Sequence, residues 1–295
     1  MAIEAFHKAS LVHDDIQDND QFRYGRDTLH REYGVGQAIN IGDHLIGLGY
    51  RLIHGSRDLD PAIAVDVADR MSTAHIRLCD GQGAEMSWQQ SPDWNITPLD
   101  ALQIYSLKTS PAFEAALYAG LRMANHKLAS SDMVSAFCRH VGVAFQILND
   151  LKDWQGDKDN KMRSGQDALA LRPTVLLALA LKDADEEQRG TLQKILCGEF
   201  NELSEEVRID KMRAIFERCG VFEKAETLVE RSQERAEAIV EEIDDERIQA
   251  LLQFFVETVL ARDEGPTPAE HLDGTGDAPS AVSQPVFVSL SLGGN

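Results

Sequence analysis

The chain has 295 residues, of which 43% are hydrophobic and 26% are charged, and its formal net charge is -20 at pH 7. These proportions are ordinary for a soluble globular protein. A chain this acidic repels nucleic-acid phosphates, so we expect no nucleic-acid partner. The overall charge does not exclude a small anionic substrate, because a local cation cluster or a bound metal reverses the sign at one site.

The four cysteines and the N-terminal residues indicate where the protein works. No two cysteines have C-x-x-C spacing, which favours free thiols in a reducing cytosol over disulfides or a zinc site. No segment is long and apolar enough to cross a bilayer. The N-terminal residues lack the basic region and apolar run of a signal peptide. We therefore expect a cytoplasmic protein without a transmembrane segment.

Apolar periodicity predicts a mainly helical chain. Helices are expected over residues 2–18, 37–54, 61–87, 131–154, 173–183, 185–197, 205–217 and 222–262. Thr97 and Pro98 begin a further helix, which runs to about Ser110 and resumes after Pro111 as far as Met123. Residues 20–36 and 155–172 are expected to form loops, the first with a short helix, and strand-like alternation is absent before the C-terminal end.

The composition changes at Arg262, after which Gly, Pro and small polar residues dominate. We therefore predict one helical domain over residues 1–262 and a flexible tail over 263–295. The first helix begins at Met1 with no capping residue before it. Either a helix end is exposed near the site, or the sequence starts too late and lacks N-terminal helices.

A first acidic motif lies at the end of the first helix. Asp14 and Asp18 share a helical face at i, i+4, and Asp15 lies three residues before Asp18. Like charges at this spacing repel, and a cation relieves the repulsion. Hard carboxylate oxygens with room for water favour Mg²⁺. The alternative is a solvated acidic helix end without a ligand.

A second oxygen-rich cluster ends the apolar helix over 131–154. Asn149 and Asp153 are spaced i, i+4, and Asp150 lies four residues after Gln146. If the two helices face each other, two oxygen clusters lie across one apolar cavity. Such an arrangement suits a diphosphate held through several Mg²⁺ ions, with a hydrocarbon chain below it.

Cations accompany both acidic motifs. Arg23 follows the first motif, Lys108 and Thr109 lie where a central helix breaks, and Arg163 and Arg172 follow the second motif. Each of these residues alone is typical of a protein surface. Their positions around two acidic motifs favour a joint role in binding phosphate.

Further segments occur in matching order, and in them the chain resembles the trans-isoprenyl diphosphate synthases of the polyprenyl synthetase family. The match runs from about Glu4 to the helix after Thr174, and more loosely to about Arg262. It rests on Phe6–Asp18, Arg23–Gly25, Thr28–His30, Ala38–Asp43, Gly81–Gln82, Lys108–Thr109, Phe145–Asp153, Gly165–Asp167 and Arg172–Thr174.

The resemblance implies antiparallel helices packed around a deep central cavity, usually in a homodimer. It implies that Mg²⁺ ions are held on an allylic diphosphate by Asp14, Asp15, Asp18, Asn149, Asp150 and Asp153. The expected catalytic residues are Asp14, Asp15, Asp18, Lys108 and Asp150. The expected substrate-binding residues are His7, Arg23, Lys108, Thr109, Gln146, Arg163 and Arg172, among which His7 matches a position that helps bind isopentenyl diphosphate.

The implied reaction condenses an allylic diphosphate with isopentenyl diphosphate to give a longer all-trans polyprenyl diphosphate, of the geranylgeranyl or longer class. Breaking the allylic C–O bond forms a carbocation and a highly charged pyrophosphate. Metals and cationic side chains stabilise that leaving group as it forms. The double bond of isopentenyl diphosphate then attacks the cation, and a proton leaves.

Three departures from the family pattern keep other functions open. The upstream Gly-Lys-x-x-Arg segment is missing, Tyr24 stands where a second Arg is usual, and Asn149 replaces an Asp. Arg163 also stands where the family usually has Lys. The alternatives are a non-catalytic or regulatory subunit of a heteromeric synthase, and a terpene cyclase-like enzyme that ionises an allylic diphosphate without adding an isopentenyl unit.

The first helix also predicts where a growing hydrocarbon chain lies. Side chains a turn apart stack along one helical face, so a pocket is expected from Asp14 back past Ser10, Ala9 and Phe6. Ser10 and Ala9 are small enough for a chain to pass, and Phe6 forms part of a floor. Ordinary helix packing is the alternative.

Overall fold

The computed structural model describes residues 1–90, 95–155 and 172–262. Residues 1–261 form one compact unit. The loop expected over 155–172 lies, apart from its first and last residues, outside the described ranges, as does the predicted tail. Arg163 is also outside them.

Helices make up most of the described residues, which confirms the all-α prediction. The longer helices are α1 (Ala2–Gln17), α3 (Val35–His54), α4 (Pro61–Gln89), α6 (Ser110–Met123), α7 (Asp132–Gln155), α11 (Glu205–Arg218), α12 (Val221–Glu241) and α13 (Glu246–Val259). The shorter elements are α2 (Leu29–Tyr33), α5 (Pro98–Lys108), the 3₁₀ helix η1 (Lys127–Ser130), α9 (Val175–Asp183) and α10 (Glu186–Leu196). Two strands, β1 (Phe22–Arg23) and β2 (Arg26–Asp27), pair in a small antiparallel hairpin.

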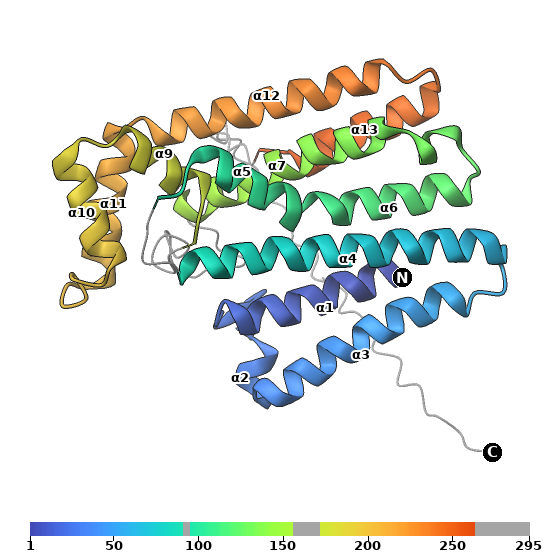
Figure 1. Ribbon diagram of the computed structural model, residues 1–295, viewed down its shortest axis with the longest axis horizontal. Coiled ribbons are helices and arrows are strands. Elements are labelled where there is room, and N and C mark those ends of the chain that lie inside the picture. Colours follow the sequence, from blue (N-terminus) through green and yellow to red (C-terminus); the bar gives the residue numbers. More distant parts are fainter. Residues whose placement is uncertain (91–94, 156–171, 263–295) are drawn as a thin grey trace, which may run out of the picture. The chain divides into compact units, whose positions relative to one another are not determined.

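The long helices pack side by side within this unit. Figure 1 shows α3, α1, α4, α6, α7 and α12 aligned along one direction, with α10 and α11 crossing it at one end. α1 packs on α3, α4 on α6, and α7 on both α6 and α12. The apolar faces of amphipathic helices are buried by this arrangement, which leaves most charged residues at the surface; Asp15, Glu85 and Asp150 are among the buried exceptions.

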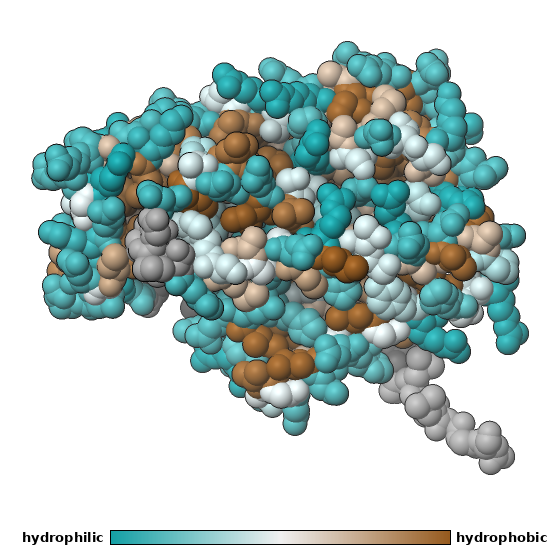
Figure 2. Space-filling model, in the orientation of Figure 1, coloured by the Kyte–Doolittle hydropathy of each residue, from teal (hydrophilic) through white to brown (hydrophobic). Residues whose placement is uncertain are grey.

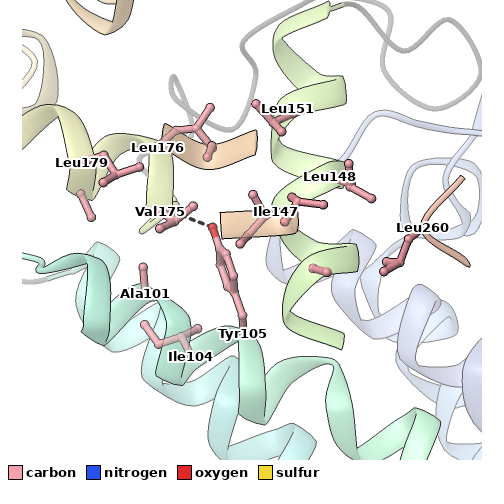
Figure 3. Close-up of a cluster of buried hydrophobic side chains, with 14 of the residues drawn as sticks. Ala101, Ile104, Tyr105, Ile147, Leu148, Leu151, Val175, Leu176, Leu179 and Leu260 are labelled. Carbon is pink, nitrogen blue, oxygen red and sulfur yellow. Dashed lines mark hydrogen bonds between the residues drawn. The ribbon is translucent and has the colours of Figure 1, made fainter. Parts of the chain in front are cut away.

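The largest hydrophobic core lies around α7 and α9. Phe137 and Ile147 of α7, Leu176 of α9 and Phe216 of α11 are almost fully buried. α9 is apolar on every side from Val175 to Leu181 and is buried throughout. Figure 3 shows α9 packed beside α5 and α7, so the core fixes the end of α7 that carries the second acidic motif.

α1 and α3 approach each other closely because two glycines of α3 face two aromatic rings of α1. A Cβ atom at Gly49 would lie 2.7 Å from Cζ of Phe6, and one at Gly42 would overlap the imidazole of His13. The two residue pairs match an antiparallel register. Both glycines are buried, and a larger residue at either position would displace the facing ring.

The structure corrects several boundaries. The helix expected over 222–262 is two helices, because Asp245 caps a new one by accepting hydrogen bonds from the N–H groups of Arg247 and Ile248. The break before α6 lies at Thr109, since Pro111 occupies the first turn, where its missing N–H is not needed. The β1–β2 hairpin and η1 were not expected, because strands and 3₁₀ turns this short leave no periodic signal.

Candidate active site

A cavity of about 620 Å³ opens between α1, α4 and α6. Its wall is mostly apolar, with Phe6 and Ala9 from α1, Met71 and Leu78 from α4, and Phe113 from α6. A volume and lining of this kind are typical of a small-molecule site. Phe6, Ala9, Ser10 and Asp14, along which a pocket for a growing chain was predicted, all line this cavity, and its role in holding such a chain stays a prediction.

Asp14 and Gln82 bring polar atoms into this apolar wall. The pKa of Asp14 is raised to about 6, chiefly by burial; the carboxylates of Asp18 and Glu85 also raise this pKa, whereas Lys108 and Arg23 lower it. Neither amide atom of Gln82 has a hydrogen-bond partner among the described residues, although both are buried. A bound polar group would satisfy both side chains.

Arginines hold the other carboxylates of the first motif. Nε of Arg23 donates to Oδ1 of Asp15 at 2.9 Å, and Nη2 of Arg172 lies 2.9 Å from Oδ2 of Asp18. Asp20 lies between the two guanidinium groups, 3.6 Å from that of Arg23 and 3.5 Å from that of Arg172. The structure thus brings both predicted arginines to the first acidic motif.

Lys108 lies beside the same motif but pairs with a residue of α4. Its Nζ donates to both carboxylate oxygens of Glu85 at 2.9 Å. Burial lowers the pKa of Lys108, but the negative charges of Glu85, Asp14 and Asp18 outweigh burial and raise it overall. Gly81 permits this contact, because a Cβ atom there would lie 2.7 Å from the backbone N of Lys108.

The second motif is anchored from α5 and α9. The Tyr105 hydroxyl donates to Oδ2 of Asp150, and its oxygen accepts the N–H of Val175 at 2.7 Å. Figure 3 shows this hydroxyl reaching the first residue of α9. Asp150 is 3% exposed and also accepts from the amide of Gln146 at 3.4 Å, while Thr109 donates to the Gln146 carbonyl oxygen at 3.2 Å.

The remaining predicted residues occupy more varied positions. Asp153 is buried and Asn149 partly exposed near the end of α7. His7 lines the cavity and lies 3.5 Å from the carboxylate of Glu4. Tyr24 is exposed in the turn between β1 and β2, with φ at +52°, and Lys8 lies over its ring.

Four residues with polar roles at the site were not predicted to be there: Gln82, Glu85, Tyr105 and Asp20. Gln82 and Glu85 follow Gly81 on one turn of α4, and Tyr105 lies three residues before Lys108. Gln82, Glu85 and Tyr105 could have been found in the sequence, because each is a polar residue on an otherwise apolar helical face. Asp20 follows the first helix and carried no pattern of its own.

The carboxylate-rich set fits a hard divalent cation by its chemistry, but the described side chains do not form a ready-made metal centre. Among residues 1–90, 95–155 and 172–262, no group of three potential ligands converges on one point. Asp15 and Asp18 are instead paired with arginines. Asp14 has no such partner among the described residues, and its carboxylate faces the cavity. A metal at this site would need ligands from a bound molecule as well.

Comparison with known sequences places this arrangement in a family. The polyprenyl synthetase family model matches residues 1–212. The chain belongs to the polyprenyl synthetase family. No helix within the described ranges of this family member is long and apolar enough to cross a membrane.

Two similar sequences carry the same name. A short chain isoprenyl diphosphate synthase of Methanocaldococcus jannaschii is 31% identical over 70% of the chain and 62% of the relative. The same-named protein of Methanothermobacter thermautotrophicus is 29% identical over 86% of the chain and 77% of the relative. The match thus spans less than two thirds of the length of the first relative and about three quarters of the length of the second.

A solved structure shares the fold. The geranylgeranyl pyrophosphate synthase of Corynebacterium glutamicum, complexed with isoprenyl diphosphate and magnesium, superposes with a TM-score of 0.79 at 21% identity. The match covers 88% of this chain and 77% of that one. The predicted isoprenoid synthase type of all-α fold is therefore confirmed.

Proposed function

We propose that this chain is a prenyltransferase that condenses an allylic diphosphate with isopentenyl diphosphate to form a longer all-trans polyprenyl diphosphate, of the geranylgeranyl or longer class. One observation carries the proposal. Asp14 lines the apolar cavity of about 620 Å³, and its carboxyl lies close enough to the cations Lys108 and Arg23 for their charges to lower its pKa. A ligand with a hydrocarbon tail and an anionic head matches this division between an apolar wall and a charged end.

The charged end supplies what an allylic diphosphate needs to ionise. Lys108 and Arg23 carry positive charge beside the place where pyrophosphate charge develops, and buried cations stabilise that charge more than exposed ones do. Arg172 adds a third cation, the second guanidinium of the site, through its pair with Asp18. The apolar wall keeps water from the allylic cation, which would otherwise be captured as an alcohol.

Magnesium is the proposed cofactor, with several ions bridging the diphosphate. The proposal rests on the oxygen-only donor set of Asp14, Asp15, Asp18, Asp150 and Asp153, which suits a hard cation. The Corynebacterium glutamicum relative was crystallised with magnesium and isoprenyl diphosphate. Bound metal supplies charge to stabilise the leaving pyrophosphate, while this chain's carboxylates orient it.

The test is an assay with labelled isopentenyl diphosphate and an allylic partner, in EDTA and then with added Mg²⁺. Longer prenyl diphosphates should appear only with metal, and undiminished activity in EDTA would contradict the metal proposal. Products from the allylic substrate alone would indicate a cyclase-like enzyme instead. Activity that appears only after a homologous chain is added would indicate a non-catalytic subunit.

A homodimer is the proposed assembly. Figure 2 shows hydrophobic side chains at the surface over α2 and the beginning of α3, where Tyr33, Val35 and Ile39 are exposed. On α4, Val65 and Ile76 are 61% and 64% exposed. Apolar residues left open on adjacent helices suit a face that a second copy covers. Sedimentation equilibrium should give twice the chain mass, and Ile76→Glu should shift the protein toward monomer.

A further inference from the structure

Phe6 lies in the wall of the cavity, and its position depends on the helix behind it. The cavity is lined by α1, α4 and α6, whereas α3 packs on the other side of α1 and adds only Ile46 among the described lining residues. Phe6 lies two turns before Asp14 on α1, which places it about 12 Å from the charged end along the helix axis. Its ring is therefore part of the wall that a hydrocarbon tail would pass, with Ile3 and Glu4 lining the cavity beyond it.

Three neighbours fix the ring of Phe6. Tyr50 meets it edge-on with a centroid distance of 4.8 Å, and His75 lies across at 6.4 Å. The space behind the ring exists because residue 49 is a glycine. A Cβ atom at Gly49 would lie 2.7, 2.8 and 2.9 Å from Cζ, Cε2 and Cε1 of the ring, closer than carbon atoms pack.

We propose that Gly49 is a positioning residue for substrate and product length, and that it acts by letting the Phe6 ring rest against α3 instead of projecting into the cavity. The inference rests on the proposed prenyltransferase function. A methyl group at residue 49 must displace the ring, and Tyr50 blocks one side of it. The open direction is the cavity, because Phe6 already lines it. A displaced ring shortens the space for the tail and leaves the charged end unchanged.

Gly47 provides a matched control on the same helix. It is exposed, and a Cβ atom there meets no heavy atom within 4 Å. Gly47→Ala and Gly49→Ala therefore make the same change in helix propensity and backbone freedom. Only Gly49→Ala adds a group that contacts a cavity-lining ring.

The experiment measures calorimetric affinity, with Mg²⁺ present, for geranyl, farnesyl and geranylgeranyl diphosphate, and then the product lengths. In Gly49→Ala, affinity for the longest ligand should fall about tenfold or more, while affinity for the shortest should stay within about twofold of wild type. Gly47→Ala should bind all three as wild type does. Products of Gly49→Ala should be shorter than those of wild type.

Phe6→Ala tests the mechanism even if Gly49→Ala folds poorly. Removing the ring should lengthen the products, and Gly49→Ala should have no further effect in that background. Unchanged product length in Phe6→Ala would overturn the inference, as would an equal loss of affinity for all three ligands in Gly49→Ala. Wild-type protein that binds none of the diphosphates would overturn the proposed function and this inference with it. Wild-type binding without any length-dependent change would overturn the inference alone.

Discussion

Lys108 of α5 and Glu85 of α4 form a buried ion pair in which both carboxylate oxygens accept from one ammonium group at 2.9 Å. The pair joins two helices next to Asp14 and Asp18, so it contributes both to the fold and to the charge of the site. Removing one partner leaves the other buried without compensation.

Glu85→Gln and Lys108→Met should therefore each lower the free energy of unfolding by about 3–5 kcal/mol. The double variant should lose less than the sum, because neither change then leaves a buried charge alone. Urea unfolding of the four proteins measures the coupling. Single variants as stable as wild type would show that solvent already screens this pair.

The buried carboxyl of Asp14 should make stability depend on pH. Its pKa is raised from 3.8 to about 6, chiefly by burial, so the folded protein binds this proton more tightly than the unfolded chain does. Stability contributed by the protonated form is present below about pH 4 and is lost as pH rises through about 6. Asp14→Asn cannot ionise, so its stability relative to wild type should increase across that window by roughly 2–3 kcal/mol. Urea titrations in EDTA measure this, and a pH-independent difference would contradict it.

Asp15→Ala and Asp150→Ala should each lower turnover by about a hundredfold or more without unfolding the protein, because each removes a buried carboxylate proposed to orient metal. Asp27→Ala is the control, since Asp27 is exposed on β2. Circular dichroism would verify the fold. Near-normal turnover in either test variant would show that its cluster is not part of the metal site.

Ala9 offers a second route to shorter products. It is 1% exposed, lines the cavity and lies between Phe6 and Asp14 on α1. A tyrosine at this position has to occupy the cavity, so Ala9→Tyr should shorten the product distribution. Lys8→Tyr adds the same ring on a face of α1 that does not line the cavity. Product lengths that stay the same in an active Ala9→Tyr enzyme would count against a tail in this pocket.

Tyr105 links the second acidic motif to the core. Tyr105→Phe removes a donor to Asp150 and the acceptor of the Val175 N–H, which should cost about 1–3 kcal/mol of stability. Turnover should need a higher Mg²⁺ concentration, because Asp150 is less firmly oriented. Tyr118→Phe is the control, since the hydroxyl of Tyr118 makes no hydrogen bond within the described part of the chain. Equal effects of the two changes would refute this role.

Features encoded by local spacing could be predicted from the sequence. The i, i+4 pattern of Asp14 and Asp18, and the stacking of Phe6, Ser10 and Asp14 on one face, follow from helix geometry alone. The structure has both, and Asp14 does line a cavity. The break between α12 and α13 is also encoded locally, by the cap at Asp245. It was missed because the acidic residues before Asp245 are typical of an exposed helix that continues.

Contacts between helices could not be derived in the same way. Glu85 meets Lys108 only because α4 and α5 cross at Gly81, and no periodicity gives a crossing point. Arg23 and Arg172 were expected to bind phosphate, but in the structure they neutralise Asp15 and Asp18. Which anion an arginine meets depends on the folded geometry and on what is bound.

Gly42 and Gly49 of α3 influence the orientation of the carboxylates in the first acidic motif. Gly49 receives Phe6 and Gly42 receives His13, so the two helices can neither slide nor roll against each other without driving a ring into a backbone. His13 directly precedes Asp14, and α1 between the two rings is a continuous helix. These two contacts fix the rotation of α1 about its own axis and its position along α3. The direction in which its carboxylates point is thus fixed in part by α3, a helix that contributes only Ile46 to the described lining of the cavity.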